Sequence, residues 1–182
     1  MVVPRGIKQI VAAYGQPARN GKLDPKWLAE NTIVVTLPFP MRLAWRLSTI
    51  VRKCRLHRKA APVILEALEQ VWVYGRLQVK KQDGFDKLSS YYDREGLRWL
   101  QRQGVDRFGG AFTFRIMRNG TKLSTHAFAI AIDFDPEHNA MGTPGTLPRW
   151  LVRIFEGLGF AWGGRWKGNR CDPMHFQLAV GY

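Results

Sequence analysis

The sequence has little of three things that would each assign it to a particular class of protein. Its 182 residues include only two cysteines, Cys54 and Cys171, too few for a disulfide framework or for a zinc site made of four cysteines. No stretch comes near the roughly 18 consecutive apolar residues that cross a membrane. Residues 1–13 hold no apolar core of signal-peptide length, so we expect a cytoplasmic protein.

Acidic residues are also scarce. Fourteen Asp and Glu stand against 28 Lys and Arg, which leaves a formal net charge of +14. Such a surface attracts polyanions, and charge alone does not choose among nucleic acid, anionic membranes and anionic wall polymers. No acidic residue occurs between Glu30 and Glu66, so the basic stretch 42–59 is a candidate docking surface. The alternative is the solvated face of a helix.

The remaining composition, 46% hydrophobic and 23% charged, is that of a globular protein without internal repeats or a linker. We therefore expect one domain over 1–182, with an α+β fold in which helices pack on a small antiparallel sheet. Its first part, about 1–105, would be mainly helical, and about 106–182 would form the sheet region. Helices are predicted at 6–14, 24–30, 41–58, 62–74, within 83–103, and at 148–158; strands are predicted at 32–37, 76–80, 109–116, 126–134 and 175–180.

Two of the four histidines have neighbours that indicate metal chemistry. His126 and Asp133 are seven residues apart, and His175 follows Asp172 by three. Two imidazoles and a carboxylate are the ligand set of a catalytic zinc with an open fourth position, and a second carboxylate can serve as general base. Residues seven apart on a regular strand face opposite ways, so either His126 precedes the strand or a bulge shifts the parity. The spacing alone leaves an alternative to a metal site open, in which these histidines and aspartates form only structural hydrogen bonds.

Three segments make the prediction of a metal site more specific. Ser124–Asp133 resembles a signature S-x-H-x-x-G-x-A-x-D, although Ala129 stands in place of its glycine. The run 162–166, Trp-Gly-Gly-Arg-Trp, followed by Asp-Pro-Met-His at 172–175, is similar to W-G-G-x-W before D/E-x-x-H. Residues 109–115 resemble a segment that ends in an active-site arginine. Together they make 109–178 resemble the zinc D-alanyl-D-alanine carboxypeptidase family, which also contains the L-alanyl-D-glutamate endopeptidases of bacteriophage lysis.

The resemblance implies a role for each matching residue. Zn²⁺ would be held by His126, Asp133 and His175. Asp172 would be the general base that takes a proton from the attacking water, and Arg115 would stabilise the oxyanion. Ser124 would lie behind the metal ligands and would not touch the metal.

Several neighbouring residues have less certain roles. Arg118 is a rival of Arg115 for the oxyanion. Trp162 and Trp166 either line the substrate groove or belong to the core, and Arg165, where the family often has an acid, would change substrate contacts. The sequence 135–138, Asp-Pro-Glu-His, predicts a turn rather than a second metal site. The other tryptophans, Trp45 among them, are predicted in the core, and His57 on the surface.

The resemblance thus implies a single-domain zinc metallopeptidase, D-Ala-D-Ala carboxypeptidase/hedgehog-like in fold, that hydrolyses peptidoglycan stem peptides. We expect an L-alanyl-D-glutamate endopeptidase that acts as a phage or prophage endolysin, waits in the cytoplasm and reaches the cell wall after holin-type release. A D-alanyl-D-alanine carboxypeptidase is the alternative within the class. We expect a monomer without a separate wall-binding domain or nucleic-acid partner, whose basic surface binds lipopolysaccharide or wall polymers.

An alternative from another class is a non-catalytic, basic polyanion-binding module on the same fold. Against it, every expected ligand and the expected base are present in the sequence.

Overall fold

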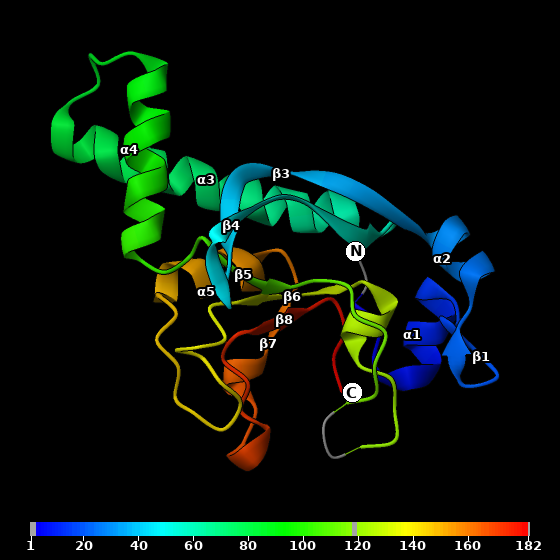
Figure 1. Ribbon diagram of the computed structural model, residues 1–182. Coiled ribbons are helices and arrows are strands. Elements are labelled where there is room, and N and C mark those ends of the chain that lie inside the picture. Colours follow the sequence, from blue (N-terminus) through cyan, green and yellow to red (C-terminus); the bar gives the residue numbers. More distant parts are fainter. Residues whose placement is uncertain (1–2, 118–119, 182) are drawn as a thin grey trace.

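A six-stranded sheet joins the two halves of the chain in the computed structural model, which describes residues 3–117 and 120–181. The strand order is β4-β3-β5-β6-β8-β7, and only β3 and β5 pair in parallel (Figure 1). The α+β class expected from the sequence is confirmed. The elements are α1 Gly6–Tyr14, β1 Ala18–Arg19, β2 Lys22–Leu23, α2 Pro25–Asn31, β3 Thr32–Leu43, β4 Arg46–His57, α3 Ala61–Asp83, α4 Ser89–Arg102, β5 Arg107–Gly110, the 3₁₀ helix η1 Thr125–Phe128, β6 Ala131–Phe134, α5 Arg149–Gly157, β7 Ala161–Trp162, the 3₁₀ helices η2 Gly163–Arg165 and η3 Gly168–Arg170, and β8 His175–Gln177.

Helices α3 and α5 cover one face of this sheet. Phe39 of β3 stacks on Trp72 of α3, with ring centroids 5.7 Å apart. Phe155 of α5 packs against Phe134 of β6 and Phe176 of β8. Because side chains alternate along a strand, the neighbours of Phe134 and Phe176 point to the other face. That other face is therefore where Asp133 and His175 lie.

The hairpin of β3 and β4 corrects the helix predicted at 41–58. Leu43, Leu47, Ile50 and Cys54 recur at helical spacing, but β4 pairs antiparallel with β3 along most of its length. Cross-strand pairing and burial against α3 override the local periodicity, which is a weak preference. The basic stretch thus lies on an edge strand and not on a helix.

The strand predicted at 32–37 continues to Leu43 in spite of two prolines. The register between β3 and β4 shifts between Thr36 and Met41, and Pro38 and Pro40 lie within this interruption. Proline has no N–H to donate to a neighbouring strand, so an interruption of the ladder is where it can be accommodated.

Helix α3 runs past Gly75, where the sequence predicted its end and a following strand. A Cβ at Gly75 would lie 2.9 Å from Leu100 Cγ of α4, so the glycine permits a close helix crossing instead of ending the helix. The helix ends at Gly84, with φ 88°. The end of α3 and α4 form an arm that projects from the sheet (Figure 1).

Four predicted helices are confirmed: α1, α2, α5 and α4, which lies within the predicted range 83–103. Helix α2 begins as its sequence indicates, because the Asp24 carboxylate accepts a hydrogen bond from the Lys26 N–H at 2.9 Å and Pro25 takes the first helical position. No helix in the described ranges has the length and apolar character that a membrane span needs.

His57 is buried, with 1% of its surface exposed, and the surface position predicted for it is wrong. Its Nε2 lies 3.0 Å from the Tyr14 carbonyl oxygen, and its Nδ1 accepts the Lys59 N–H. Burial lowers the pKa of His57, so the neutral imidazole is favoured. His57 therefore connects α1 to the end of β4.

Ala129 ends η1 in the left-handed region, with φ 56°, a conformation that costs a residue with a Cβ about 1–2 kcal/mol. We expect Ala129→Gly to leave the protein more stable than Ala127→Gly by that amount. Both alanines are fully buried, so both variants lose a methyl group and gain the same freedom in the unfolded chain. Urea unfolding of both variants in the presence of a chelator measures the difference. Equal stabilities would contradict the strain at Ala129.

Candidate metal centre

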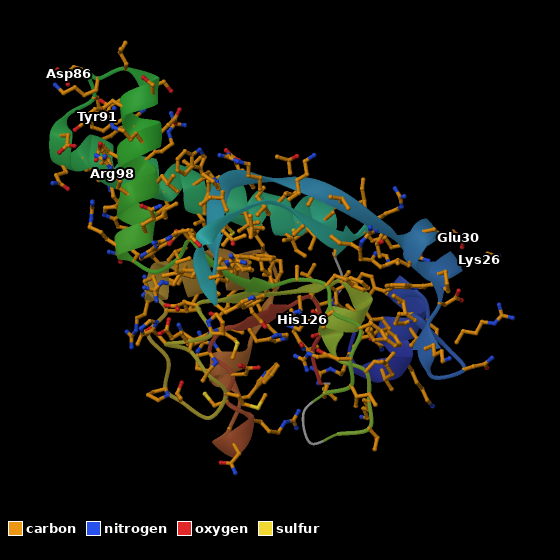
Figure 2. All side chains as sticks on the ribbon, in the orientation of Figure 1. Lys26, Glu30, Asp86, Tyr91, Arg98 and His126 are labelled. Carbon is orange, nitrogen blue, oxygen red and sulfur yellow. The ribbon has the colours of Figure 1, made fainter. Side chains whose placement is uncertain are left out.

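Three side chains from three elements converge on one point. His126 comes from η1, Asp133 from β6, and His175 from β8, where it pairs directly with Asp133. His126 Nε2 lies 3.1 Å from Asp133 Oδ1 and 3.1 Å from His175 Nδ1, and His175 Nδ1 lies 2.9 Å from Asp133 Oδ1. All three residues are buried. Figure 2 marks His126 on the body of the protein, away from the arm that carries Asp86 and Tyr91.

The structure resolves how His126 and Asp133 share a point. Residues 126–128 belong to η1 and not to a strand, so the predicted strand 126–134 is correct only from Ala131. The Ser124 side chain accepts a hydrogen bond from the His126 N–H and begins the 3₁₀ helix. Left-handed Ala129 then redirects the chain into β6. His126 therefore lies on the turn before the strand, the first of the two alternatives.

Hydrogen bonds behind the ligands orient both imidazoles. His126 Nδ1 lies 2.8 Å from the Ala111 carbonyl oxygen, which can only accept. His175 Nε2 lies 2.9 Å from Gln177 Oε1, and the Gln177 amide nitrogen donates to the Ala179 oxygen. With protons on the outer nitrogens, His126 Nε2 and His175 Nδ1 turn lone pairs toward Asp133.

This donor set fits a divalent metal ion. The three inward atoms are all acceptors, and they lie close to the separation of about 3.3 Å expected of ligands in a tetrahedral site with bonds of about 2.0–2.1 Å. Burial by itself would raise the pKa of Asp133, but the charge and hydrogen bonds of His126 and His175 in their protonated forms hold that pKa well below its usual range. The carboxylate is thus ionised, as a ligand must be. A bound metal ion would take the place of those inner protons.

Thr125 and Gln177 are site residues that sequence reasoning missed. Gln177 Oε1 accepts from His175 and from the Thr125 hydroxyl, at 2.9 and 3.0 Å. The signal for Gln177 was its position two residues after His175 on a predicted strand, which places both on one face. No comparable signal marks Thr125, because a 3₁₀ helix was not expected there.

A cavity of about 350 Å³ opens onto the metal ligands. Arg115 lines it and is exposed at its surface. Arg118 lies outside the described residues. The lining consists of Trp45, Gly109, Gly110, Thr113, Arg115, His126, Asp133, Pro136, Ala140 and Met174.

Asp172 lies in the turn that leads to His175, half-buried. Its N–H donates to the Gly163 carbonyl oxygen at 2.9 Å, and its own carbonyl oxygen accepts from the His175 N–H at 3.1 Å. A Cβ at Gly163 would lie 2.3 Å from the Asp172 carbonyl oxygen, so glycine is required there for the two segments to meet. Burial lowers the pKa of His175, yet that pKa is raised overall, mainly by Asp133 with a contribution from the negative charge of Asp172. The negative charge of Asp172 therefore lies close enough to His175 to favour its protonated form.

The two candidate groove tryptophans differ in position. Trp166 is half-buried, with its ring centroid 5.6 Å from that of His175, so it lies beside the ligand. Trp162 donates through Nε1 to the Pro173 carbonyl oxygen at 2.7 Å and stacks on Phe176. Trp162 therefore supports the turn that carries Asp172 instead of lining the cavity.

Arg165 does not reach the cavity either. Its guanidinium pairs with both carboxylate oxygens of Glu156 on α5. The expectation that this departure from the family pattern changes substrate contacts has no support in this arrangement.

A second group of possible ligands is formed by Asp135, Glu137 and His138. Arg107 occupies the position that a cation would need, because its Nη1 lies 3.1 Å from Asp135 Oδ1 and 2.8 Å from His138 Nδ1. His138 Nδ1 also lies 3.0 Å from Asp135 Oδ1 within the turn. This group is an ion-paired turn, as the sequence predicted.

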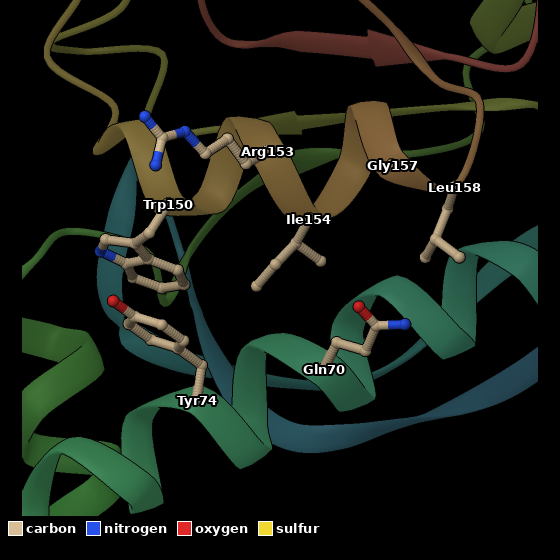
Figure 3. A pocket seen from close by; sticks show the side chains of 7 residues that line it. All are labelled: Gln70, Tyr74, Trp150, Arg153, Ile154, Gly157 and Leu158. Carbon is tan, nitrogen blue, oxygen red and sulfur yellow. The ribbon is translucent and has the colours of Figure 1, made fainter.

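Another cavity, of about 460 Å³, lies between α3 and α5 on the opposite face of the sheet (Figure 3). Tyr74 stacks on Trp150 there, with ring centroids 4.4 Å apart. Arg153 is the one charged residue in its lining, which also includes Gln70 and Ile154. Its lining has neither a carboxylate nor an imidazole for hydrolytic chemistry.

Fold and geometry thus define a candidate metallohydrolase centre: three buried ligands beside an open cavity that holds an arginine. The comparison with known families gives the particular class. Residues 118–178 match the model of a family described as D-alanyl-D-alanine carboxypeptidase. The matched third of the chain carries all three candidate ligands and Asp172, and it supports a peptidase of this family. Neither a curated protein nor a solved structure matches the chain.

Replacing Gln177 by leucine, which is of similar size, removes the acceptor that holds His175 Nε2–H. We expect zinc affinity to fall by about 10–100-fold, the usual effect of losing a group that orients a metal ligand. Competition with a chromogenic chelator measures the affinity. Far-UV circular dichroism of the metal-free variant is the control for folding. Unchanged zinc affinity in a folded variant would show that Gln177 does not orient the ligand.

Proposed function

We propose that this protein is a zinc peptidase that hydrolyses peptidoglycan stem peptides, and that it cuts between L-alanine and D-glutamate. The observation that carries the proposal is the convergence of His126 Nε2, Asp133 Oδ1 and His175 Nδ1, inside the segment that matches a peptidase family. Two imidazoles and a carboxylate with an open side toward a cavity are the donor set of a catalytic zinc, and not of a closed structural site.

The chain's own residues supply the remaining chemistry. Zinc bound here would polarise the scissile carbonyl and lower the pKa of a coordinated water. The Asp172 carboxylate takes a proton from the attacking water and passes it to the leaving amine. The Arg115 guanidinium, at the cavity surface, stabilises the negative charge that develops on the carbonyl oxygen. Gln177 and the Ala111 carbonyl keep both imidazoles in the tautomer that metal binding requires.

The openness of the cavity favours cleavage within the stem peptide. Arg115 and Trp45 are both exposed at its mouth, so a segment can enter without a free chain end. We further propose the biological role of a phage or prophage endolysin that is held in the cytoplasm and released to the wall. The D-alanyl-D-alanine carboxypeptidase is the alternative, and the products of the reaction distinguish the two.

Incubation with purified peptidoglycan sacculi is expected to release fragments with a new N-terminal D-glutamate, and a chelator is expected to abolish the release. Asp172→Asn should slow the reaction by about 10²–10⁴-fold, the usual contribution of a general base. Mass spectrometry of the fragments measures both effects.

Asp86→Asn is the matched control, because it makes the same change on the arm and should leave the rate unchanged. Release of terminal D-alanine alone would favour the carboxypeptidase. No product with any divalent metal would contradict a peptidoglycan peptidase.

The basic stretch 42–59 supports a second part of the proposal, binding to lipopolysaccharide or anionic wall polymers. Several of its cations have partners within the fold: Arg42 pairs with Asp106, and Arg58 donates to the Glu30 carbonyl oxygen. The guanidinium and ammonium groups exposed on the edge strand β4 are those of Arg46, Arg52 and Lys53.

Changing Arg46, Arg52 and Lys53 together to glutamine should weaken binding to lipopolysaccharide and flatten its salt dependence, since fewer counterions are released. Sedimentation with lipopolysaccharide between low and high salt measures both. Glutamine at Lys81, Lys87 and Arg98, on the arm, removes the same charge and is the control. Equal losses in both triple variants would show that net charge, and not β4, mediates binding.

A further inference from the structure

Trp45 is an exposed tryptophan at the mouth of the metal cavity. It lies in the turn between β3 and β4 with 69% of its surface exposed, so the core position predicted for it is wrong. It is also part of the cavity lining together with His126 and Asp133. An indole left mainly in water contributes little to folding but offers a large, rigid contact surface to a ligand.

The turn that carries Trp45 is held firmly in place. The Ala44 N–H donates to the Phe108 carbonyl oxygen at 3.0 Å, and the Arg42 N–H donates to the Asp106 carbonyl oxygen at 2.7 Å. The Arg42 guanidinium also pairs with the Asp106 carboxylate, which is fully buried. The backbone of the hairpin tip is thereby fixed to β5 next to the cavity.

Strand β5 brings this tip close to the metal ligands. A Cβ at Gly109 would lie 2.9 Å from Asp133 Cβ and 3.0 Å from Pro136 Cδ. Glycine at position 109 therefore lets β5 pack closely against Asp133 and Pro136, which brings the hairpin tip that is bonded to β5 near the ligand strand. Pro136, Ala140 and Met174 add further apolar surface to the same cavity.

We propose that Trp45, with Pro136 and Met174, forms a subsite for the methyl group of the alanine next to the scissile amide. This rests on the proposed function, and both candidate bonds place an alanine there. The subsite is apolar and lies beside the metal ligands, whereas Arg115 supplies the charged contact in the same cavity. A cavity of about 350 Å³ lies in the size range of small-ligand sites, which suits a short peptide segment.

Trp45→Ala is expected to raise KM for a soluble stem peptide about tenfold, an effect typical of a buried aromatic contact, with kcat within about twofold. Trp45→Phe should retain most of the affinity. Phe85→Ala is the matched control, because Phe85 is also 69% exposed but lies on the loop between α3 and α4. Zinc content and thermal stability should be unchanged in all three variants. An unchanged KM in Trp45→Ala would overturn the subsite.

A substrate change tests whether the contact is with the methyl group. A stem peptide with glycine in place of the alanine should bind more weakly to the wild-type protein. With this peptide, Trp45→Ala should raise KM only about twofold or less, because the methyl group that the indole would contact is missing. An undiminished tenfold effect would show that Trp45 contacts another part of the substrate and would overturn the assignment.

Calorimetric binding of the same peptide to Asp172→Asn, with and without Trp45→Ala, separates this inference from the proposed function. If the wild-type protein cleaves no stem peptide but Trp45→Ala still weakens binding about tenfold, the proposed function fails and the subsite stands. If cleavage is observed and Trp45→Ala leaves the affinity unchanged, the function stands and the subsite fails. Absence of binding to either protein would overturn the subsite.

Discussion

The pairing of β6 with β8 is the constraint on which the metal centre depends. Because Asp133 lies directly opposite His175, both side chains leave the same face of the sheet at neighbouring positions. Phe134 and Phe176 alternate with them and pack against Phe155 on the other face. A slip of one residue would bury an ionised ligand in the core and expose a phenyl ring, so packing behind the sheet fixes the geometry in front of it.

The third ligand reaches this pair by a different kind of local structure. A 3₁₀ helix and a left-handed alanine place His126 on the turn that precedes β6, and hydrogen bonds to Ala111 and Gln177 orient the two imidazoles. These groups are buried, where an unsatisfied polar atom is costly. Conformations that break one of these hydrogen bonds are therefore disfavoured, and the side chains that form them are held in place. A preorganised donor set follows, and it can bind a metal ion without large rearrangement.

The β3–β4 hairpin connects the first half of the chain to this centre. Its tip is anchored through Arg42 and Asp106, and it places an exposed indole at the cavity. The outer strand of the same hairpin exposes part of the basic stretch. A single supersecondary unit therefore carries both the proposed contact with the alanine methyl and the proposed contact with anionic polymers.

The features that could be predicted from the sequence are those with local signals. They are the N-cap of α2, the periodicity of α1 and the residue types of the ligand set, all visible in short windows. The remaining features depend on the folded chain, because long-range contacts outweigh local preference. Pairing with β3 made a strand of 46–57, and contact with Leu100 made Gly75 part of a helix. The position of Trp45 at the cavity that Asp133 also lines likewise depends on which strands become neighbours, and no local pattern encodes that.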